Sequence, residues 1–397
     1  MSSQPVYLDH AATTPVDPRV IDRMQACLGR KGVFANPASD SHAPGRAAAR
    51  EVELARQALA ELTGADPREL VWTSGATEAI NLAILGGARF HASRGRHVVT
   101  SAIEHRATLD ACRALEAEGF EVTRVDCGSD GRVSPQALAD ALRPDTVLAS
   151  VMHVNNETGV IQDIESIAGV CSEAGVALHV DAAQSLGKLP IDLGRLPVAM
   201  MSFSAHKLYG PKGIGALFLR RRPRARVTPL MYGGGHERGL RPGTLATHQI
   251  AGMGEACRIA IQRLEQDQQH LSGLADRLWQ GLRRPGGVSF NGDPDRRIPG
   301  ILNLHVAGID GESLVAGAPG VAFALGSACT SASPEPSHVL RAMGHDEQHI
   351  RASLRLSPGR FTTAAEIDVA VAELLAEIAR LRELSPLWHS GGEALPQ

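Results

Sequence analysis

The chain has 397 residues, 43% of them hydrophobic and 21% charged, which is the balance of a soluble globular protein. Its length allows a large core and predicts two domains. The net charge of −3 gives no reason to expect a nucleic-acid partner. No membrane attachment is predicted either, because no apolar run approaches the ~18 residues of a membrane span.

The six cysteines are scattered and form no CxxC pair, so neither a zinc site nor a disulfide framework is predicted. The N-terminus carries no basic region followed by an apolar one, so no signal peptide is predicted. A reducing cytoplasm is the compartment that fits these observations best.

The first part of the chain predicts two helices. Asp17 followed by proline is typical of a helix start, and the spacing of Ile21, Met24 and Leu28 predicts an apolar stripe. Gly45–Thr63 predicts a longer helix that ends at a glycine.

From residue 70 onward, apolar strands alternate with helical segments. The predicted strands are Leu70–Thr73, His97–Ser101, Glu121–Val125, Thr146–Met152, Val176–Asp181, Val198–Phe203 and Ile214–Leu219. Helices are predicted between most of them, over Glu78–Phe90, Arg106–Glu118, Pro135–Leu142 and Ile164–Ala174. This alternation predicts an α/β fold with a mainly parallel sheet covered by helices on both faces.

A long helical stretch over residues 246–283 leads into the last part of the chain, which predicts a smaller α+β unit. Its predicted elements are three strands and one helix, Ile301–Val306, Val321–Ala324, Ala352–Leu356 and Thr363–Leu384.

Lys207 lies in the stretch MSFSAHKLYGPKGIG, residues 201–215, on a short crossing between two predicted strands. A partly desolvated lysine beside another cation has a lowered pKa. Such an amine can form a Schiff base with an aldehyde cofactor. Taken alone, Lys207 would be a surface lysine in a turn, so its neighbours at the other strand ends decide the interpretation.

Four further strand ends carry polar residues, and ligands of doubly wound sheets bind at such ends. Asp181 can hold a pyridine nitrogen protonated, and Gln184 can donate to a ring hydroxyl; a helix N-cap is the alternative for Asp181. Residues 73–78, TSGATE, form a glycine turn before a helix, whose free N–H groups can bind phosphate. His105 can stack on a flat ring and shuttle protons, and Asn156 can bind a ring oxygen or a substrate carboxylate. Together these residues suit pyridoxal 5′-phosphate (PLP).

Two residues of the C-terminal part complete the candidate site. Cys329 lies among small polar residues, which predicts a mobile loop with an exposed, reactive thiol rather than a chance loop cysteine. Arg355 lies in an alternating run, where its guanidinium can grip a substrate α-carboxylate. An interdomain salt bridge is the alternative for Arg355.

Two other motifs are rejected. The pair Gly187-Lys188 lacks the residues of a phosphate-binding P-loop. His345 and His349 have the spacing of metal ligands on a helix, but their segment has a solvent-facing pattern and no third ligand nearby in the sequence. No metal site is therefore predicted.

These motifs resemble the cysteine desulfurases of iron–sulfur cluster assembly, in the class V aminotransferase group of fold-type I PLP enzymes, and most closely the housekeeping bacterial form. The likeness runs from residue 7 to residue 388. It rests on AATTPVDPRV at 11–20, NPAS at 36–39, TSGATE at 73–78, MHVNNETGV at 152–160, HVDAAQSLGKLPIDL at 179–193, MSFSAHKLYGPKGIGAL at 201–217, GGGHERG at 233–239 and GSACTSAS at 326–333. It implies a seven-stranded large domain over residues 15–260 and a small domain of residues 1–14 and 261–397 that carries the Cys329 loop.

The resemblance also implies a role for each site residue. Lys207 would form the Schiff base with PLP, Asp181 would pair with the pyridine nitrogen, and His105 would stack on the ring and move protons. The other cofactor-binding residues would be Ala76, Thr77, Asn156, Gln184, Ser204, His206 and Thr244. Of these, Thr244 would reach the phosphate of the other protomer, which implies a homodimer.

The implied reaction takes sulfur from L-cysteine, whose carboxylate Asn156 and Arg355 would hold. Cys329 would accept the sulfur as a persulfide while L-alanine leaves. An iron–sulfur scaffold protein and sulfur carriers would then receive it for cluster assembly and other thio-cofactors, and Cys329 could be a transient ligand of a two-iron, two-sulfur cluster in a scaffold complex. A selenocysteine lyase or another class V aminotransferase is the alternative.

The chain departs from the family pattern at several places. Ala205 replaces a usual glycine, Pro242 replaces a usual serine, and residues 315–325 differ before the cysteine loop. The tail after Trp388 is short and unlike that of close relatives, which puts the docking of a scaffold at this end of the chain in doubt.

Overall fold

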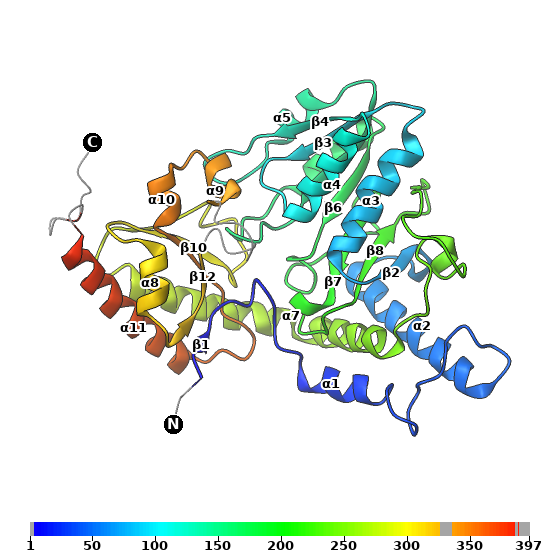
Figure 1. The fold of residues 1–397 in the computed structure, drawn as a ribbon, viewed down its shortest axis with the longest axis horizontal. Coiled ribbons are helices and arrows are strands. Elements are labelled where there is room, and N and C mark those ends of the chain that lie inside the picture. Colours follow the sequence, from blue (N-terminus) through cyan, green and yellow to red (C-terminus); the bar gives the residue numbers. More distant parts are fainter. Residues whose placement is uncertain (1–3, 326–335, 386–387, 389–397) are drawn as a thin grey trace.

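A seven-stranded sheet forms the larger part of the molecule in the computed structural model, which describes residues 4–325, 336–385 and 388 (Figure 1). The strand order is β2-β8-β7-β6-β5-β3-β4. The strands are β2 (Leu70–Thr73), β3 (His97–Ser101), β4 (Glu121–Val125), β5 (Thr146–Met152), β6 (Ala177–Asp181), β7 (Met200–Ser204) and β8 (Gly215–Leu219). β8 runs antiparallel to both its neighbours and the other pairs are parallel, so the predicted mainly parallel sheet is confirmed.

Helices cover both faces of this sheet, because its strands bury side chains on both sides. Val98 packs into one hydrophobic cluster and Val99 into another, as the alternation of side chains along a strand requires. The helices that pack around the sheet are α2 (Ala43–Thr63), α3 (Ala76–His91), α4 (Arg106–Ala117), α5 (Pro135–Ala141) and α6 (Ile164–Glu173).

A second, antiparallel sheet has its own core in the C-terminal part of the chain. Its order is β12-β13-β10-β9, with β9 (Val288–Phe290), β10 (Leu302–Val306), β12 (Ala324–Leu325) and β13 (Ser353–Leu356). Three helices, α8 (Gly311–Gly317), α9 (His338–Ala342) and α10 (Glu347–Arg351), belong to this part, and α11 (Ala364–Leu384) packs on its core.

The N-terminal segment lies beside this second unit rather than beside the large sheet. Strand β1 (Val6–Tyr7) pairs in parallel with β11 (Val321–Ala322). The single strand predicted over residues 321–324 is therefore wrong: the run divides into β11 and β12, which pair with different partners.

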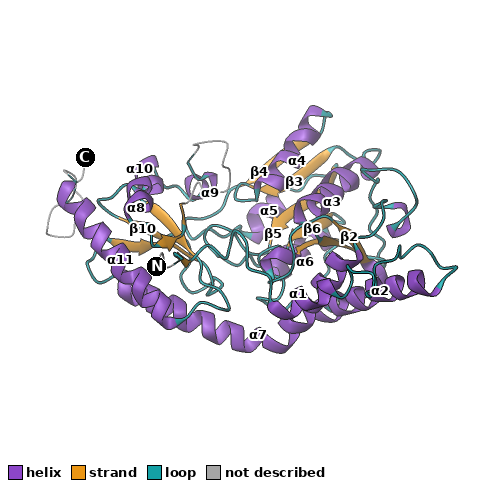
Figure 2. Ribbon diagram, turned by 60° about the horizontal axis from the view of Figure 1, so that its bottom comes forward, coloured by secondary structure: helices purple, strands orange, loops and turns teal. Residues whose placement is uncertain are grey.

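Helix α7 (Thr247–Leu282) connects the two units. Its 36 residues span about 54 Å, and it contacts α1 (Pro18–Gln25), α2 and α11. Figure 2 shows it running beneath both sheets. Short 3-10 turns η1 (Pro67–Glu69), η2 (Ala205–Lys207) and η3 (Glu237–Gly239) complete the described elements.

Of the stripe predicted on the first helix, only Met24 packs against the core, and its side chain is half-buried. α1 ends at Gln25, so Leu28 lies outside it, and Ile21 and Leu28 are 42% and 55% exposed. Val20 is the helix residue that enters the core, because it follows the packing against α7 rather than the predicted spacing. Among the described residues, no helix has both the length and the apolar character that crossing a membrane requires.

Candidate active site

A cavity of about 520 Å³ opens at the carboxyl ends of β5, β6 and β7, next to the second unit. Ten of the predicted site residues line it: Ala76, Thr77, His105, Asn156, Asp181, Gln184, Ser204, His206, Lys207 and Arg355. Thr244 is exposed and lies outside this lining, in the segment between η3 and α7. Cys329 lies outside the described residues.

Lys207 ends the 3-10 turn η2, directly after β7. Its Nζ donates a hydrogen bond to the carbonyl oxygen of Ala11, at 2.7 Å. The N-terminal segment thus forms one wall of the cavity, although nearly two hundred residues separate it from Lys207. The turn therefore presents a primary amine to the cavity, next to Asp181 and His105.

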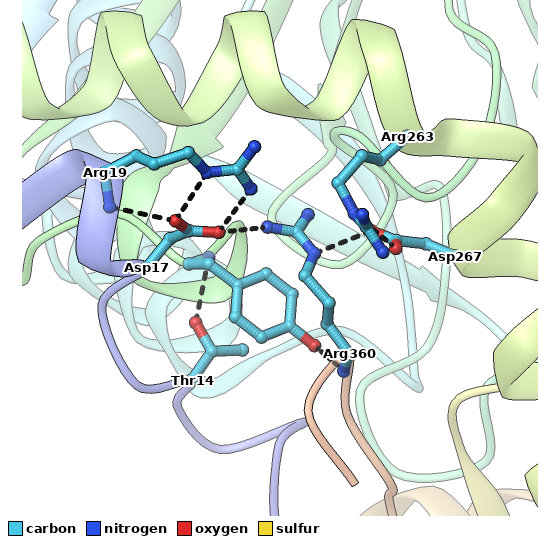
Figure 3. Close-up of polar contacts among 7 residues, drawn as sticks. Thr14, Asp17, Arg19, Arg263, Asp267 and Arg360 are labelled. Carbon is cyan, nitrogen blue, oxygen red and sulfur yellow. Dashed lines mark hydrogen bonds and ion pairs between the residues drawn. The ribbon is translucent and has the colours of Figure 1, made fainter. Parts of the chain in front are cut away.

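The turn is held in an unusual backbone conformation. Tyr209 has a φ of +59°, which side chains rarely adopt. The hydroxyl of Thr14 accepts the N–H of Tyr209 at 2.9 Å (Figure 3). The same hydroxyl donates to the carbonyl of His206 at 2.9 Å. The guanidinium of Arg360 stacks over the Tyr209 ring, 4.1 Å from its centroid. These contacts offset the backbone strain next to Lys207.

Arg360 belongs to a buried ion network that joins three segments (Figure 3). Its Nη1 lies 3.1 Å from Asp17 Oδ2, and its Nε lies 2.8 Å from Asp267 Oδ2 on α7. Arg19 and Arg263 pair with the same two carboxylates. The hydrogen bonds from Arg19 lower the pKa of Asp17, so this carboxylate stays charged. The network therefore fixes the Lys207 turn relative to the N-terminal segment, α7 and the segment after β13.

Asp181, at the end of β6, and His105, after β3, face the cavity from two strands that β5 separates. Asp181 is buried and accepts the N–H of Ala183 at 2.9 Å, and burial raises its pKa. His105 caps α4: its Nδ1 accepts the N–H of Ala107 at 3.1 Å, and burial lowers its pKa. The ring is therefore neutral, and with Nδ1 acting as acceptor its proton is on Nε2.

The cavity wall at the start of α3 is suited to an anion. The N-cap residue Gly75 supplies no side-chain cap, so the first N–H groups of this 16-residue helix remain for a ligand. His206 lies on the same wall, and burial followed by the charge of Lys207 lowers its pKa to about 4. A phosphate would supply the acceptors that these groups lack.

Arg355 extends from β13 into the cavity wall. Its Nη2 pairs with Asp9 Oδ1 at 2.8 Å, and its Nη1 donates to the carbonyl of Asn156 at 2.8 Å. Within the described part of the chain, the buried Nε finds no hydrogen-bond partner. Since buried polar groups are normally satisfied, a carboxylate ligand fits here. The salt-bridge alternative is correct in part, because Arg355 does form an ion pair, but with the N-terminal Asp9.

Sequence reasoning missed several residues of the site. Lys212 lines the cavity, and its place in the same turn as Lys207 was a usable signal. Asp9 gave no signal, because its partner Arg355 is distant in sequence. Lys188, which lies next to the site, gave none either, because only the turn of the backbone brings its side chain back to Gln184.

The segment of His345 and His349 is exposed at residues 346–348, as predicted, but the two histidine side chains are half-buried and take part in ring stacking. His349 stacks between His345 and His305, with ring centroids 4.0 and 3.8 Å apart. Its Nε2 contacts Asn291 Oδ1 at 2.7 Å. Sequence could not show this packing, because His305 comes from β10. In the part of the chain that is described, no group of three ligating side chains is arranged to hold a metal.

The donor set of the cavity fits PLP: a buried carboxylate for the ring nitrogen, an uncapped helix start for the phosphate and Lys207 for the aldehyde. The family model of the class V aminotransferases matches residues 6–369, and the chain belongs to this family, whose cofactor is PLP. The resemblance inferred from the motifs is thus confirmed.

The chain is also similar, over nearly its whole length, to individual proteins named cysteine desulfurase or NifS-like. Over 385 residues the chain is 55% identical to cysteine desulfurase IscS of Photorhabdus laumondii, covering 97% of this chain and 95% of the relative. A solved NifS-like protein superposes with a TM-score of 0.88 at 33% identity, covering 95% of this chain and 100% of its own. SspA, solved in complex with cysteine, superposes with a TM-score of 0.80 at 35% identity, covering 90% and 99%.

Proposed function

We propose that this chain is a PLP-dependent cysteine desulfurase, which takes the sulfur of L-cysteine, releases L-alanine and holds the sulfur as a persulfide on Cys329. The observation that carries the proposal is the convergence of Lys207, Asp181 and the unpartnered Nε of Arg355 on one cavity. Relatives that are 55% and 54% identical over nearly their whole length bear the name cysteine desulfurase.

Each wall of the cavity has its own task in this proposal. Bound PLP supplies an electron sink for negative charge at the substrate Cα. The start of α3, together with Ser204 and His206, binds the phosphate, and the Asp181 carboxylate holds the ring N–H. Arg355 and Asn156 bind the substrate carboxylate and so orient the Cα–H bond. Lys207 Nζ would hold the cofactor through its aldehyde, and as a free amine it would be placed to take the Cα proton.

The sulfur transfer belongs to Cys329. Its thiolate forms the S–S bond while the Cβ–S bond of the substrate breaks; the electron pair of that bond stays with the product, which leaves as L-alanine after protonation. We assign His105 as acceptor of the thiol proton. Because Nδ1 is engaged by Ala107 and Nε2 already carries a proton, His105 can accept only when the Nδ1 contact opens.

We extend the proposal to a homodimer in which Thr244 contacts the phosphate of the other protomer. Within the chain, Arg241 Nε pairs with Glu78 Oε1 at 2.9 Å, which fixes the position from which the Thr244 segment would extend to the other protomer. Nearby in sequence, Tyr232 is 82% exposed, which is unusual for a large aromatic ring and suits a covered interface.

The remaining proposals concern the domain boundaries, the cellular compartment and the acceptors of the sulfur. We propose the domain division at residues 15–260 against 1–14 and 261–397, a cytoplasmic location, and delivery of the persulfide to an iron–sulfur scaffold and to sulfur carriers. The five cysteines within the described ranges carry free thiols, which supports a reducing compartment.

Product analysis of the parent and Cys329→Ala tests the function. With L-cysteine and a thiol reductant, the parent should release alanine and sulfide in equal amounts. Cys329→Ala should release neither, with its visible cofactor absorption intact. Undiminished alanine release by Cys329→Ala would instead indicate the lyase alternative, and an aminotransferase would convert L-cysteine into its 2-oxo acid without releasing alanine.

A further inference from the structure

Lys188 occupies a position next to the site that the proposed reaction does not use. Gly187, just before it, has a φ of +67°, and a Cβ there would lie 2.1 Å from Leu208 Cδ1. The absence of a side chain thus lets this segment pack against the residue that follows Lys207. On the other side, Gln268 of α7 donates to the carbonyl of Lys188 at 2.7 Å. The backbone of Lys188 is therefore held from both sides.

The side chain of Lys188 turns back toward the cofactor pocket. Its Nζ donates to Gln184 Oε1 at 2.9 Å. Gln184 Nε2 then donates to the carbonyl of Ala11 at 2.8 Å, and the same carbonyl accepts from Lys207 Nζ at 2.7 Å. One chain of hydrogen bonds therefore links the two lysines.

We propose that Lys188 is a positioning residue for the cofactor pocket: it fixes the orientation of the Gln184 amide and places a second cation behind Lys207. The inference rests on the proposed function and deepens it. Lys188 itself does not line the substrate cavity; it lines a separate cavity of about 40 Å³, which Lys207 also borders. It must therefore act through Gln184 and Lys207.

The orientation of the Gln184 amide follows from the hydrogen-bonding groups of lysine, which has N–H donors. An ammonium or amine at Lys188 faces Gln184 with N–H groups, so the amide must present its oxygen there. The amide NH₂ is then directed to Ala11, which takes one of its two hydrogens. The second hydrogen remains for an acceptor in the substrate cavity that Gln184 lines, such as a ring oxygen of the cofactor.

The second effect is electrostatic. When Lys188 is protonated, its charge disfavours a proton on the nearby Lys207 nitrogen. The pKa of Lys188 is itself lowered to about 7, by burial first and then by Lys207 and Arg355. Such a pair titrates as a unit.

Other charged and titratable groups face the two lysines and are retained when Lys188 is substituted, although the charge of Lys188 also contributes to the lowered pKa of His10 and of His206. Around the smaller cavity they are His10, Tyr209, Asp267 and Arg360. On the substrate side they are Glu78, His105, Asp181, His206, Lys212 and Arg355. A shift on substitution at position 188 can therefore be assigned to Lys188.

The test is a pH titration of the visible absorption of the PLP-loaded enzyme, which reports the protonation of the nitrogen at Lys207. Lys188→Met removes both the donor and the charge, and should move the midpoint upward by about one pH unit. Lys188→Gln keeps a donor for Gln184 without the charge, and should show the same upward shift. Lys188→Arg keeps both and should retain the parent midpoint.

The outcomes separate this inference from the function. A midpoint that stays at the parent value in both Lys188→Met and Lys188→Gln, with the cofactor bound and folding intact, would overturn the role of Lys188 and leave the desulfurase proposal standing. If Lys188→Met does not fold, the midpoint measured for Lys188→Gln decides whether Lys188 has the proposed role. A parent protein that takes up PLP but never shows a pH-dependent band would count against Lys207 itself.

Discussion

Burial controls the ionisation of single residues around Lys207. Glu104 shows this most clearly: its Oε1 accepts from Ser101 Oγ at 2.5 Å and from the N–H of Met152 at 2.9 Å. Its Oε2 has no hydrogen-bond partner among the described residues. Burial raises the pKa of Glu104 to about 8, so it is a neutral acid at physiological pH.

The pH dependence of stability should therefore change in Glu104→Gln. From pH 4.5, the unfolded value, to about 8, the folded protein holds a proton that the unfolded chain has lost. This contribution to the free energy of unfolding falls as pH rises, by about 1 kcal/mol per unit. Glutamine does not titrate, so the free energy of unfolding of Glu104→Gln, measured in urea, should increase relative to that of the parent as pH rises from 5 to 8. Parallel curves, as expected for the exposed control Glu165→Gln, would contradict this.

His105 carries the proton chemistry in this account. In His105→Gln the side chain can still form a hydrogen bond but cannot exchange a proton at neutral pH. We expect kcat for alanine formation to fall by roughly 10²–10⁴-fold. The visible absorption of the bound cofactor should persist, which separates this loss from loss of PLP. A variant with near-parent kcat would exclude His105 as the proton carrier.

At the scale of elements, the strands of the large sheet other than the edge strand β4 were predictable because they are buried on both faces. Such strands are continuous apolar runs, and their predicted bounds agree with β2 to β8 within two residues. The short strands β11 and β12 were not separable, because their division depends on which distant strand each one pairs with.

The turn at Gly187 gives a prediction on local packing. In Gly187→Ala, the new methyl group would meet Leu208, and the positive φ adds strain. We expect a loss of about 2 kcal/mol in the free energy of unfolding. The matched control is Gly169→Ala on α6, where a Cβ meets nothing within 4 Å; there alanine should stabilise slightly. Equal stability of the two variants would show that the close packing at Gly187 is not rigid.

At the scale of the whole molecule, the Arg360 network connects the parts of the chain that surround the site. In Arg360→Met, Asp17 still pairs with Arg19 and Asp267 still pairs with Arg263. Both carboxylates lose their ion pair with Arg360. We expect the free energy of unfolding to fall by about 2–3 kcal/mol. The pKa of Asp17 is lowered in the folded protein, so its carboxylate is charged above about pH 4. The difference in the free energy of unfolding between parent and Arg360→Met should therefore be largest above about pH 4 and should decrease at lower pH.

An exposed pair provides the control for this prediction. Arg277 pairs with Asp368 at the surface, where their side chains are 50% and 55% exposed. Arg277→Met should leave urea unfolding close to that of the parent, since exposed ion pairs contribute little. If both arginine variants behaved alike, the buried network would have no special part in holding the Lys207 turn.

The site was predictable where it follows the edge of the sheet. Asp181 ends a strand, and His105 and Lys207 follow within four residues of a strand end; parallel strands bring such residues together. Asp9 with Arg355, and Asp17 with Arg360, were not predictable, because each pair is more than three hundred residues apart in sequence. Their proximity depends on how the N-terminal segment packs on the second unit.

The most direct test of the central claim is mass spectrometry of the PLP-loaded protein after brief exposure to L-cysteine without reductant. We predict one added sulfur atom on the peptide that contains Cys329, removable by a thiol and absent in Lys207→Ala. Added sulfur that appears equally in Lys207→Ala, or on other cysteines but never on Cys329, would contradict the account.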